Sequence, residues 1–280
     1  MNLKKDIKSL INRFVDDDIT ALAAQLSYNL IISFFPFLIF LMTLVGYSSL
    51  TSQDVLREMQ QAFPEAVFQL INNVVIEIVD TKSPNLLSFS IIITIWSASS
   101  GFRAIIKGLN KAYDEEEERS IVSVTLISVV STLTLGLLII ATILFLVFGE
   151  IIGNMFVIKF GYPKLFKFTW NIVRYMIIIS MESFVFMSFY HYLPSRRLTW
   201  KEVIPGSVFT TVGWIITSLG FAFYVNNFAN YSRLYGSLGA VFVLLTWLYL
   251  TSMVILIGGE INAVLAIDKK DEYKKKEKDI

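Results

Sequence analysis

Two acidic side chains within otherwise apolar stretches are the residues of this chain best placed to do chemistry. Glu182 is the only Asp, Glu, Lys or Arg between 175 and 195, and Glu260 follows two glycines at the end of another apolar stretch. An ionisable group at membrane depth is costly, so it usually faces a cavity or a partner. Two readings stay open for Glu182: a proton or substrate site, or a neutral acid bonded to a neighbouring helix. Glu260 either lines a cavity or binds loop amides at the membrane interface.

Polar side chains also follow one face of the first apolar stretch. At 100° per residue they fall within about 80° of one another, and they are Gln25, Asn29, Ser33, Pro36 and Thr43. Lipid disfavours such a stripe, so we expect it to face helices or water, and interhelical hydrogen bonding is slightly favoured over the lining of a pathway. Asn262 lies about 200° around a straight helix from Glu260. The two can share a cavity only if Gly258 and Gly259 break the helix.

The sequence offers few residues for metal binding and none for thiol chemistry. The chain has no cysteine and one histidine, His191, which excludes disulfides, thiolate catalysis and a His-rich zinc centre. A carboxylate metal site would need clustered acidic residues, which the apolar stretches lack. His191 lies nine residues after Glu182, on the opposite helix face, so the two do not pair. We expect no enzyme, cofactor or metal; an intramembrane hydrolase is a third reading, without visible Ser–His or paired-Asp geometry.

Long apolar helices must position these residues. Apolar residues make up 55% of the 280 residues, and a helix needs roughly 20 mostly apolar residues to cross the hydrocarbon core. Soluble helices keep a polar face, which these stretches lack. We predict an all-α, polytopic membrane protein with one domain over 1–267, and Pro36 predicts a kink in its first span. Its six transmembrane helices are expected at about 21–46, 86–106, 121–148, 174–193, 203–229 and 236–260.

Amphipathic and charged segments flank these spans. Residues 3–15 have the pattern of a basic amphipathic helix suited to an anionic leaflet, and the alternative is a solvated leader. Within the outer amphipathic segment 54–81, we predict a surface helix at 65–79 that turns its apolar face to lipid or to the mouth of the bundle. That face comprises Val67, Leu70, Ile71, Val74 and Ile78. Aromatic residues alternate with lysines over 150–174, which is typical of the headgroup level. The charged tail 268–280 is expected to be disordered.

The distribution of Lys and Arg predicts the orientation. With the N-terminus inside, the inner segments carry 17 of these residues and the outer segments carry 7. Cytoplasmic loops of membrane proteins carry the excess of positive charge. We therefore expect a multi-pass protein of the cell membrane with both termini in the cytoplasm.

Short motifs recur in a definite order over residues 15–267. They are Ala21-Leu22-Ala23-Ala24-Gln25-Leu26-Ser27-Tyr28, Phe35-Pro36, Trp96-Ser97 with Gly101, Asn110-Lys111-Ala112-Tyr113, Leu193-Pro194, Pro205-Gly206, Tyr235-Gly236-Ser237-Leu238-Gly239-Ala240, Leu245-Thr246-Trp247-Leu248-Tyr249 and Gly258-Gly259-Glu260-Ile261-Asn262-Ala263. This order resembles the YihY/BrkB family of bacterial inner-membrane proteins. The resemblance implies six transmembrane helices in the cytoplasmic membrane. At Gly259 the family often has alanine, and the glycine is expected to loosen that helix end.

The resemblance leaves the function open. Members of the family have carried a ribonuclease label, which does not fit here because the sequence shows neither a His/Asp metal cluster nor a basic groove with aromatic platforms. The leading hypothesis is transport of a lipid or amphiphilic solute, with membrane lipids as partners and no nucleic acid. The alternative is a non-transporting envelope assembly or structural factor, and oligomerisation is left open. The expected cavity residues are Glu182, Gln25, Asn29, Ser33, Glu260 and Asn262.

Overall fold

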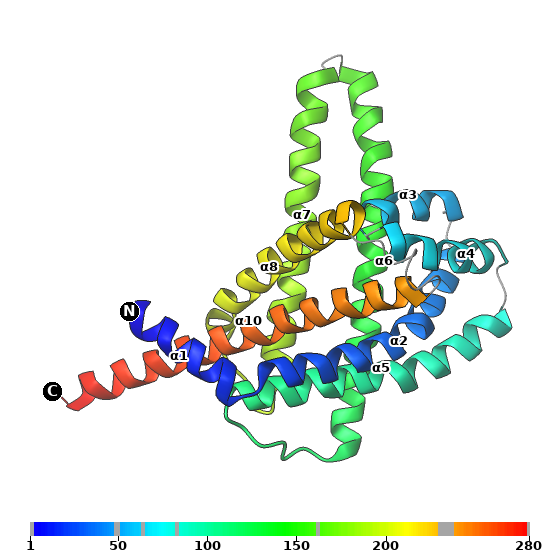
Figure 1. Cartoon of the computed structure of the whole chain (residues 1–280). Helices are drawn as coiled ribbons and strands as arrows, with labels where there is room; N and C mark the ends of the chain where they lie inside the picture. The colour runs from blue at the N-terminus through cyan, green and yellow to red at the C-terminus, as the bar shows by residue number, and fades with distance from the viewer. Residues whose placement is uncertain are drawn as a thin grey trace.

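The computed structural model describes residues 3–47, 51–62, 65–81, 84–160, 163–228 and 238–278, and every regular element in these ranges is a helix (Figure 1). The all-α class is therefore confirmed. The helices are α1 (Leu3–Asp16), α2 (Ile19–Gly46), α3 (Ser52–Ala62), α4 (Glu65–Thr81), α5 (Pro84–Ala112), α6 (Ile121–Phe160), α7 (Pro163–Tyr192), α8 (Trp200–Phe228) and α10 (Leu238–Lys278).

Six long helices, α2, α5, α6, α7, α8 and α10, share one end of the molecule, which we call the anchored end. It comprises α1, residues 113–120, residues 193–199 and the second half of α10. Arg13 of α1 bonds to the carbonyl oxygen of Ala112, the last residue of α5. Arg119, just before α6, bonds to the carbonyl oxygen of Leu193, just after α7. Successive long helices therefore alternate in direction, and both termini lie toward the same side (Figure 1).

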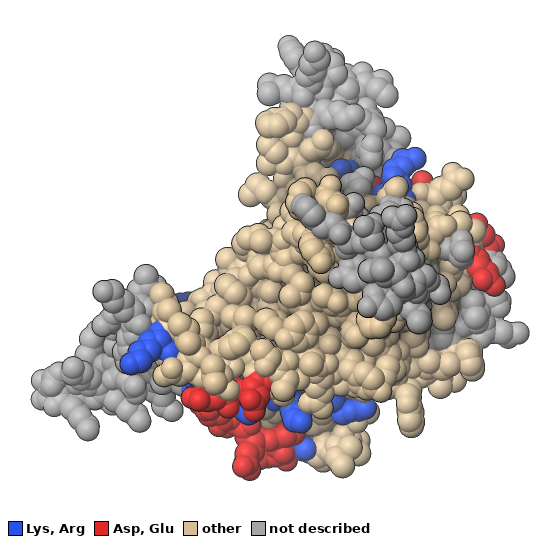
Figure 2. All heavy atoms as spheres, in the orientation of Figure 1, with Lys and Arg blue, Asp and Glu red and all other residues tan. Residues whose placement is uncertain are grey.

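Five of the long helices are long and apolar enough to cross a membrane. They contain candidate spans at Ile19–Thr43, Ile121–Thr142, Phe168–Tyr192, Trp200–Val225 and Val241–Ala266. These match five of the six predicted spans. α5 is not among them, so a crossing at 86–106 stays a prediction. On the face drawn in Figure 2, charged side chains gather in separate patches with a broad uncharged region between them.

Local capping explains the boundaries at the anchored end. Thr199 begins α8 with a capping box, in which its backbone N–H and its hydroxyl both donate to the Glu202 carboxylate at 2.8 Å. α5 ends in a Schellman motif, with Glu115 N–H donating to Asn110 O at 2.9 Å and Asp114 N–H to Lys111 O at 3.1 Å. Asp114 takes the left-handed conformation, φ 53°, that this motif requires.

The two largest apolar cores of the described bundle lie at different levels. One lies toward the anchored end and unites α2, α5, α7 and α10; among its members are Leu26, Phe102, Leu109, Phe189, Tyr190 and Ile255. The other joins the second half of α2 to α3 and α4; it includes Leu38, Met42, Val55, Ile71, Val75 and Val79. The predicted helix at 65–79 is α4, and its apolar face packs on the bundle. The side chains of Val67 and Leu70 lie outside the described residues.

The structure corrects two expectations about the connecting segments. The polar connection 54–81 holds two helices, α3 and α4, and the sequence singled out only the second. Within 150–174, α6 runs to Phe160 and α7 begins at Pro163, and the headgroup level of this segment stays a prediction. The tail expected to be disordered continues α10 as far as Lys278, because its Lys and Glu residues are strong helix formers. Pro36, where a kink is predicted, does not end α2, which continues to Gly46.

Candidate functional site

Glu182 lies close to the middle of the candidate span Phe168–Tyr192 on α7. Its side chain is half-buried. Helical periodicity places it on the same face as Phe186, which is buried in the core that joins α5, α7 and α10. Among the described residues, no hydrogen-bond donor reaches its carboxyl group. Glu182 is therefore an acidic group that faces the bundle at membrane depth without a described partner.

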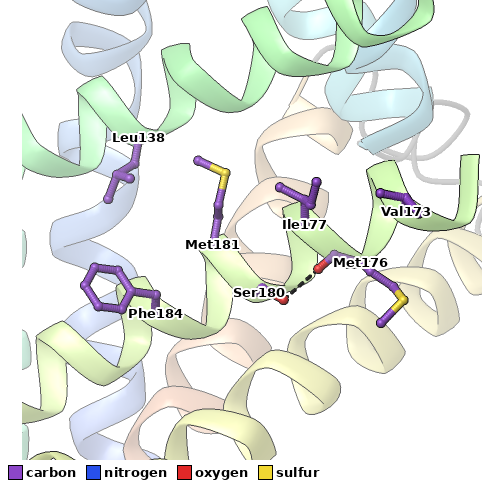
Figure 3. Close-up of a pocket in the computed structure, with 7 residues that line it drawn as sticks. All are labelled: Leu138, Val173, Met176, Ile177, Ser180, Met181 and Phe184. Carbon is purple, nitrogen blue, oxygen red and sulfur yellow. Dashed lines mark hydrogen bonds between the residues drawn. The ribbon is translucent and has the colours of Figure 1, made fainter. Parts of the chain in front are cut away.

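An apolar groove runs along the other side of α7. It has a volume of about 670 Å³ and is open to the surroundings, and the side chains that line it are Leu138 of α6 with Val173, Met176, Ile177, Ser180, Met181 and Phe184 of α7 (Figure 3). Its one polar side chain, Ser180, donates to the carbonyl oxygen of Met176 in its own helix at 2.7 Å. Glu182 does not line this groove, because it lies on the opposite face of α7.

The polar stripe of α2 faces α5. Ser33 is buried and donates to the carbonyl oxygen of Ser97 in α5 at 2.6 Å. Lys107 of α5 donates to the side-chain oxygen of Gln25 at 3.4 Å, and Asn29 donates to Gln25 O within α2 at 2.9 Å. At Ser33 the interhelical hydrogen bond is therefore observed. α2 packs chiefly on α5, α10 and α4, whereas α7 packs on α8 and α6, so the stripe and Glu182 belong to different helix pairs.

Glu260 and Asn262 lie on an unbroken α10. Gly258 and Gly259 stand within the helix, so the break that the sequence required for a shared cavity does not occur. Glu260 is 1% exposed, and its carboxylate lies 3.5 Å from the guanidinium of Arg13. The side-chain oxygen of Asn262 instead accepts from the backbone N–H of Gly206 at 2.7 Å. Glu260 is thus paired with a side chain of α1 rather than with loop amides.

The glycine pair of α10 permits a close crossing with three helices. A methyl group at Gly258 would collide with the hydroxyl groups of Thr210 and Tyr190, and one at Gly259 would meet Leu109 of α5 at 2.6 Å. Tyr190 is fully buried at this crossing. Its hydroxyl lies 2.6 Å from that of Thr210 and donates to Ile255 O at 2.7 Å. Gly259 therefore tightens the packing here rather than loosening the helix end.

Other motif residues serve packing. Trp247 is buried, donates to the hydroxyl of Ser218 at 3.1 Å and lies edge-on to Trp214, with ring centroids 6.2 Å apart. Gly239 is also buried. Pro205 lies in the first turns of α8, next to Gly206. Tyr235 and Gly236 lie outside the described residues.

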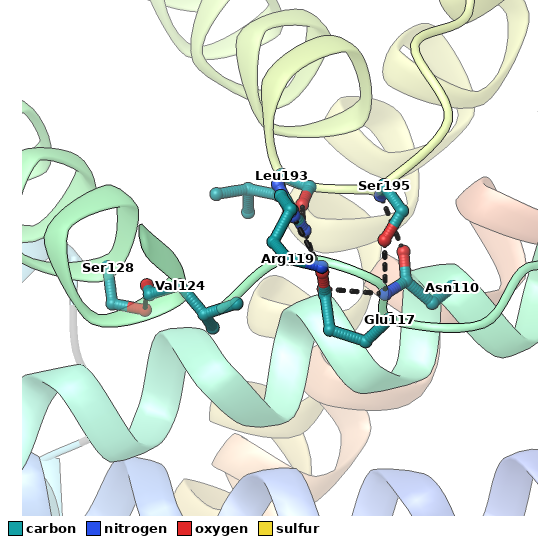
Figure 4. A network of polar contacts seen from close by, with 7 residues as sticks. All are labelled: Asn110, Glu117, Arg119, Val124, Ser128, Leu193 and Ser195. Carbon is teal, nitrogen blue, oxygen red and sulfur yellow. Dashed lines mark hydrogen bonds and ion pairs between the residues drawn. The ribbon is translucent and has the colours of Figure 1, made fainter. Parts of the chain in front are cut away.

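A polar network that the sequence did not reveal ties the two loops of the anchored end together (Figure 4). Glu117 accepts two hydrogen bonds from the guanidinium of Arg119, each 2.7 Å long, and one from the amide of Asn110 at 2.9 Å. Asn110 also accepts from the backbone N–H of Ser195 at 2.7 Å. The bonds from Arg119 first, and that from Asn110, lower the pKa of Glu117 to about 2, against the effect of burial.

This network gives a structural meaning to two of the motifs. Asn110 belongs to the motif that ends α5, and Leu193-Pro194 immediately precedes Ser195. Glu117 and Arg119 lie in the charged run of the 113–120 loop. Only their pairing across the fold shows that the run also binds the 193–195 segment.

The structure offers little for metal chemistry. Over the part of the chain that it describes, no three His, Cys, Asp or Glu side chains are grouped so that they could hold a metal ion. His191 lies beside Leu198 O at 2.5 Å and stacks on Trp200 with ring centroids 4.5 Å apart. It therefore packs at the turn between α7 and α8.

The family model and the similar proteins point to the same family. The model of the family described as Virulence factor BrkB matches residues 10–280. A Bacillus subtilis protein named "Putative ribonuclease-like protein YfkH" is 40% identical over 264 residues, which cover 94% of this chain and 96% of that protein. A Psychrobacter protein named "UPF0761 membrane protein PsycPRwf_0630" is 26% identical over 93% of this chain but only 48% of its own length. No solved structure matches the chain. By the extent of the family match and of the Bacillus relative, this multi-pass membrane protein belongs to the BrkB family.

Proposed function

We propose that this protein translocates a lipid or an amphiphilic solute across the cell membrane and has no enzymatic activity of its own. In this proposal α5 is the sixth crossing helix and the anchored end faces the cytoplasm. The alternating directions of the six long helices and the excess of Lys and Arg on this side support that orientation. Within the membrane, Glu182 would be the polar residue of the pathway, whereas the stripe of α2 packs against α5.

The observation that carries the proposal is the position of Glu182. A half-buried acidic side chain in the middle of a membrane-spanning helix destabilises the protein unless it has a partner or a use. Because no described residue supplies a hydrogen bond, water, a proton or a polar headgroup is left to satisfy it. Polar side chains of this kind are typical of substrate and ion pathways.

The groove on the opposite face of α7 supports an amphiphilic substrate. Its walls are almost entirely apolar, and methionine and phenylalanine adapt well to acyl chains. α7 thus presents an apolar groove on one side and a carboxyl group on the other. A molecule with a polar head and an apolar chain has the chemistry to use both faces.

Replacement of Glu182 by Gln tests the proposal, because it keeps the shape and hydrogen-bonding capacity of the side chain and removes its titration. In proteoliposomes with fluorescently labelled phospholipid, we expect Glu182→Gln to lower the translocation rate about tenfold or more, a loss of about 1.4 kcal/mol or more, at a normal level of folded protein. The matched control is Glu116→Gln, which changes an exposed loop residue. Full activity of Glu182→Gln would exclude coupling through this residue.

The anchored-end network favours a second candidate, a non-transporting envelope assembly or structural factor. Asn110, Glu117, Arg119 and Ser195 lock two loops into one rigid surface, which is what a docking platform requires. This reading predicts that the parent protein shows no translocation above protein-free vesicles. It also predicts that loop variants disturb the cell envelope more strongly than Glu182→Gln does.

A further inference from the structure

A buried polar cluster lies where α1 meets α10, separate from Glu182. Its members are Arg13 and Asp17 of α1, Tyr113 and Asp114 after α5, and Glu260 and Asn262 of α10. Arg13 donates to Asp114 at 2.5 Å and to Ala112 O at 3.0 Å, and it lies 3.5 Å from Glu260 and 3.9 Å from Asp17. The joint between α1 and α2 brings these groups together, with Asp18 in the left-handed conformation at φ 49°.

Within the part of the chain that the structure describes, both carboxylate oxygens of Glu260 are buried without a hydrogen-bond partner. The side chains of Tyr113 and Asn262 are buried as well and lie close to each other. Glu260, Tyr113 and Asn262 are 1%, 4% and 0% exposed. A buried polar group that lacks a partner costs roughly 1–3 kcal/mol. The carboxylate of Glu260, which has two such oxygens, therefore indicates a site that something else completes.

The cluster also carries more negative than positive charge. Among its described members, one guanidinium faces three carboxylates, those of Asp17, Asp114 and Glu260. Burial would lower the pKa of Arg13, but its hydrogen bond to Asp114 and the three negative charges raise it instead. Arg13 therefore stays charged, and it already binds Asp114. Three carboxylates against one guanidinium leave two negative charges without compensation, and Asp17 and Glu260 share them.

The carboxylates of Asp17 and Glu260 lie 3.9 Å and 3.5 Å from the same guanidinium nitrogen of Arg13, so the two acidic groups are close neighbours. Two ionised carboxylates in contact repel each other, and one proton turns that repulsion into a hydrogen bond. A proton suits this site better than a metal cation, because the positive charge of Arg13 already lies beside the carboxylates and the side-chain oxygen of Asn262 is bonded to the backbone N–H of Gly206. Around this part of α10, Ile19 and Ala23 of α2 pack with Leu256, and Tyr190 of α7 lies against Gly258 and Gly259.

We propose that Glu260 is a proton-binding site, that its acid form donates to Asp17, and that this proton holds α1 against α10. Loss of the proton restores the repulsion between the two carboxylates and loosens α1. The docked state binds more protons than the undocked state, so docking is favoured at low pH and lost as pH rises. This inference does not depend on whether the protein carries a lipid.

α1 is built to transmit such a change to the membrane surface. Ile7, Ile11 and Val15 follow one another at intervals of four residues and are all exposed, whereas Arg13 turns inward. An amphipathic helix with such a face lies in the lipid interface. The proton site therefore connects an interfacial helix with the crossing of α8 and α10 at Gly258.

Spin labels can measure the docking directly, because the chain has no cysteine of its own. Cysteines would replace the exposed residues Asn12 of α1 and Glu116 of the 113–120 loop, and distances would be measured in nanodiscs between about pH 5 and pH 9. We expect a single short distance at low pH and a growing population of longer distances at high pH. A one-proton equilibrium limits the change in the ratio of the two populations to about tenfold per pH unit.

Variants separate this proposal from a purely structural contact. Glu260→Gln and Asp17→Asn each supply the missing hydrogen bond without titrating, so both are expected to keep α1 docked throughout. Asp114→Asn is the control: it weakens docking by removing a partner of Arg13 but leaves the pH dependence in place. If Glu260→Gln does not reach the membrane, Asp17→Asn carries the test. A parent distance that does not change with pH, or a pH response retained in either variant, would overturn the proposal.

Discussion

Asn262 of α10 accepts a hydrogen bond from the backbone N–H of Gly206 in α8, across 2.7 Å, at a point where no side chain fits between the helices. A methyl group on Gly206 would collide with the carbonyl oxygen of Gly258 and with the Asn262 side chain. The hydrogen bond and the glycine therefore depend on each other. They fix the crossing of α8 and α10, next to the buried Glu260.

The first prediction concerns this crossing. We expect Gly206→Ala to destabilise the folded protein by about 1–3 kcal/mol, because the obstructing atom is backbone and cannot turn aside. Thermal unfolding in detergent measures the effect. Gly220→Ala is the matched control, since a methyl group at Gly220 would meet nothing within 4 Å and alanine favours the helix by roughly 1 kcal/mol. Equal melting temperatures for the two variants would contradict the close crossing.

The second prediction concerns acid sensitivity at the anchored end. The pKa of Glu117 is lowered from 4.5 to about 2, so its ionised form stabilises the fold above its ordinary pKa. That stabilisation is lost as the pH falls from about 4.5 toward 2, because the unfolded chain takes up the proton first. We expect the melting temperature of the parent to fall over this range more steeply than that of Glu117→Gln. Parallel curves would show that Glu117 does not contribute.

The sequence predicts the long helices well because each is determined by local composition. Five expected spans coincide with candidate membrane helices, and the residue spacing alone predicts α1 and α4. Errors arise where helix length depends on neighbouring segments. The 150–174 segment and the charged tail lack a local stop signal such as the Schellman motif after α5, so α6, α7 and α10 extend further than hydropathy suggests.

The sequence predicts the site less well. Glu182, Glu260 and the α2 stripe stand out because they are polar residues in apolar surroundings, but their partners come from distant parts of the chain. Arg13 reaches Glu260 across almost the whole sequence, and Ser33 reaches Ser97 from another helix. Periodicity gives the direction of a side chain around its own helix but not the helix it meets. The structure therefore distributes the predicted cavity residues over three separate helix contacts.

The third prediction compares two serines with different roles. Ser33 donates to Ser97 O across the contact of α2 and α5, whereas Ser180 donates only within α7. Because hydrogen bonds between membrane helices contribute about 0.6 kcal/mol on average and at most about 1.7, we expect Ser33→Ala to lower stability by an amount in this range. Ser180→Ala should leave it unchanged. Denaturant titration in micelles distinguishes them, and equal stability would remove the interhelical role of Ser33.

The fourth prediction concerns topology. α2 leads away from the anchored end, and α5 returns to it and ends there at Ala112, where α6 begins from the same network at Arg119. If α2 crosses the membrane and the anchored end lies on one side, α5 must therefore cross back. With six crossings, Glu272 in the tail and the 113–120 loop lie in the cytoplasm, and Gln60 of α3 lies outside. Single cysteines at these positions report directly, since the parent has none. In intact cells, an impermeant thiol reagent is expected to label Gln60→Cys but not Glu272→Cys or Glu116→Cys, and permeabilised cells should allow all three to react. Labelling of Glu272→Cys before permeabilisation would place the anchored end outside, against the charge distribution. Labelling of both Gln60→Cys and Glu116→Cys in intact cells would place the two ends of α5 on the same side and would mean that α5 does not cross.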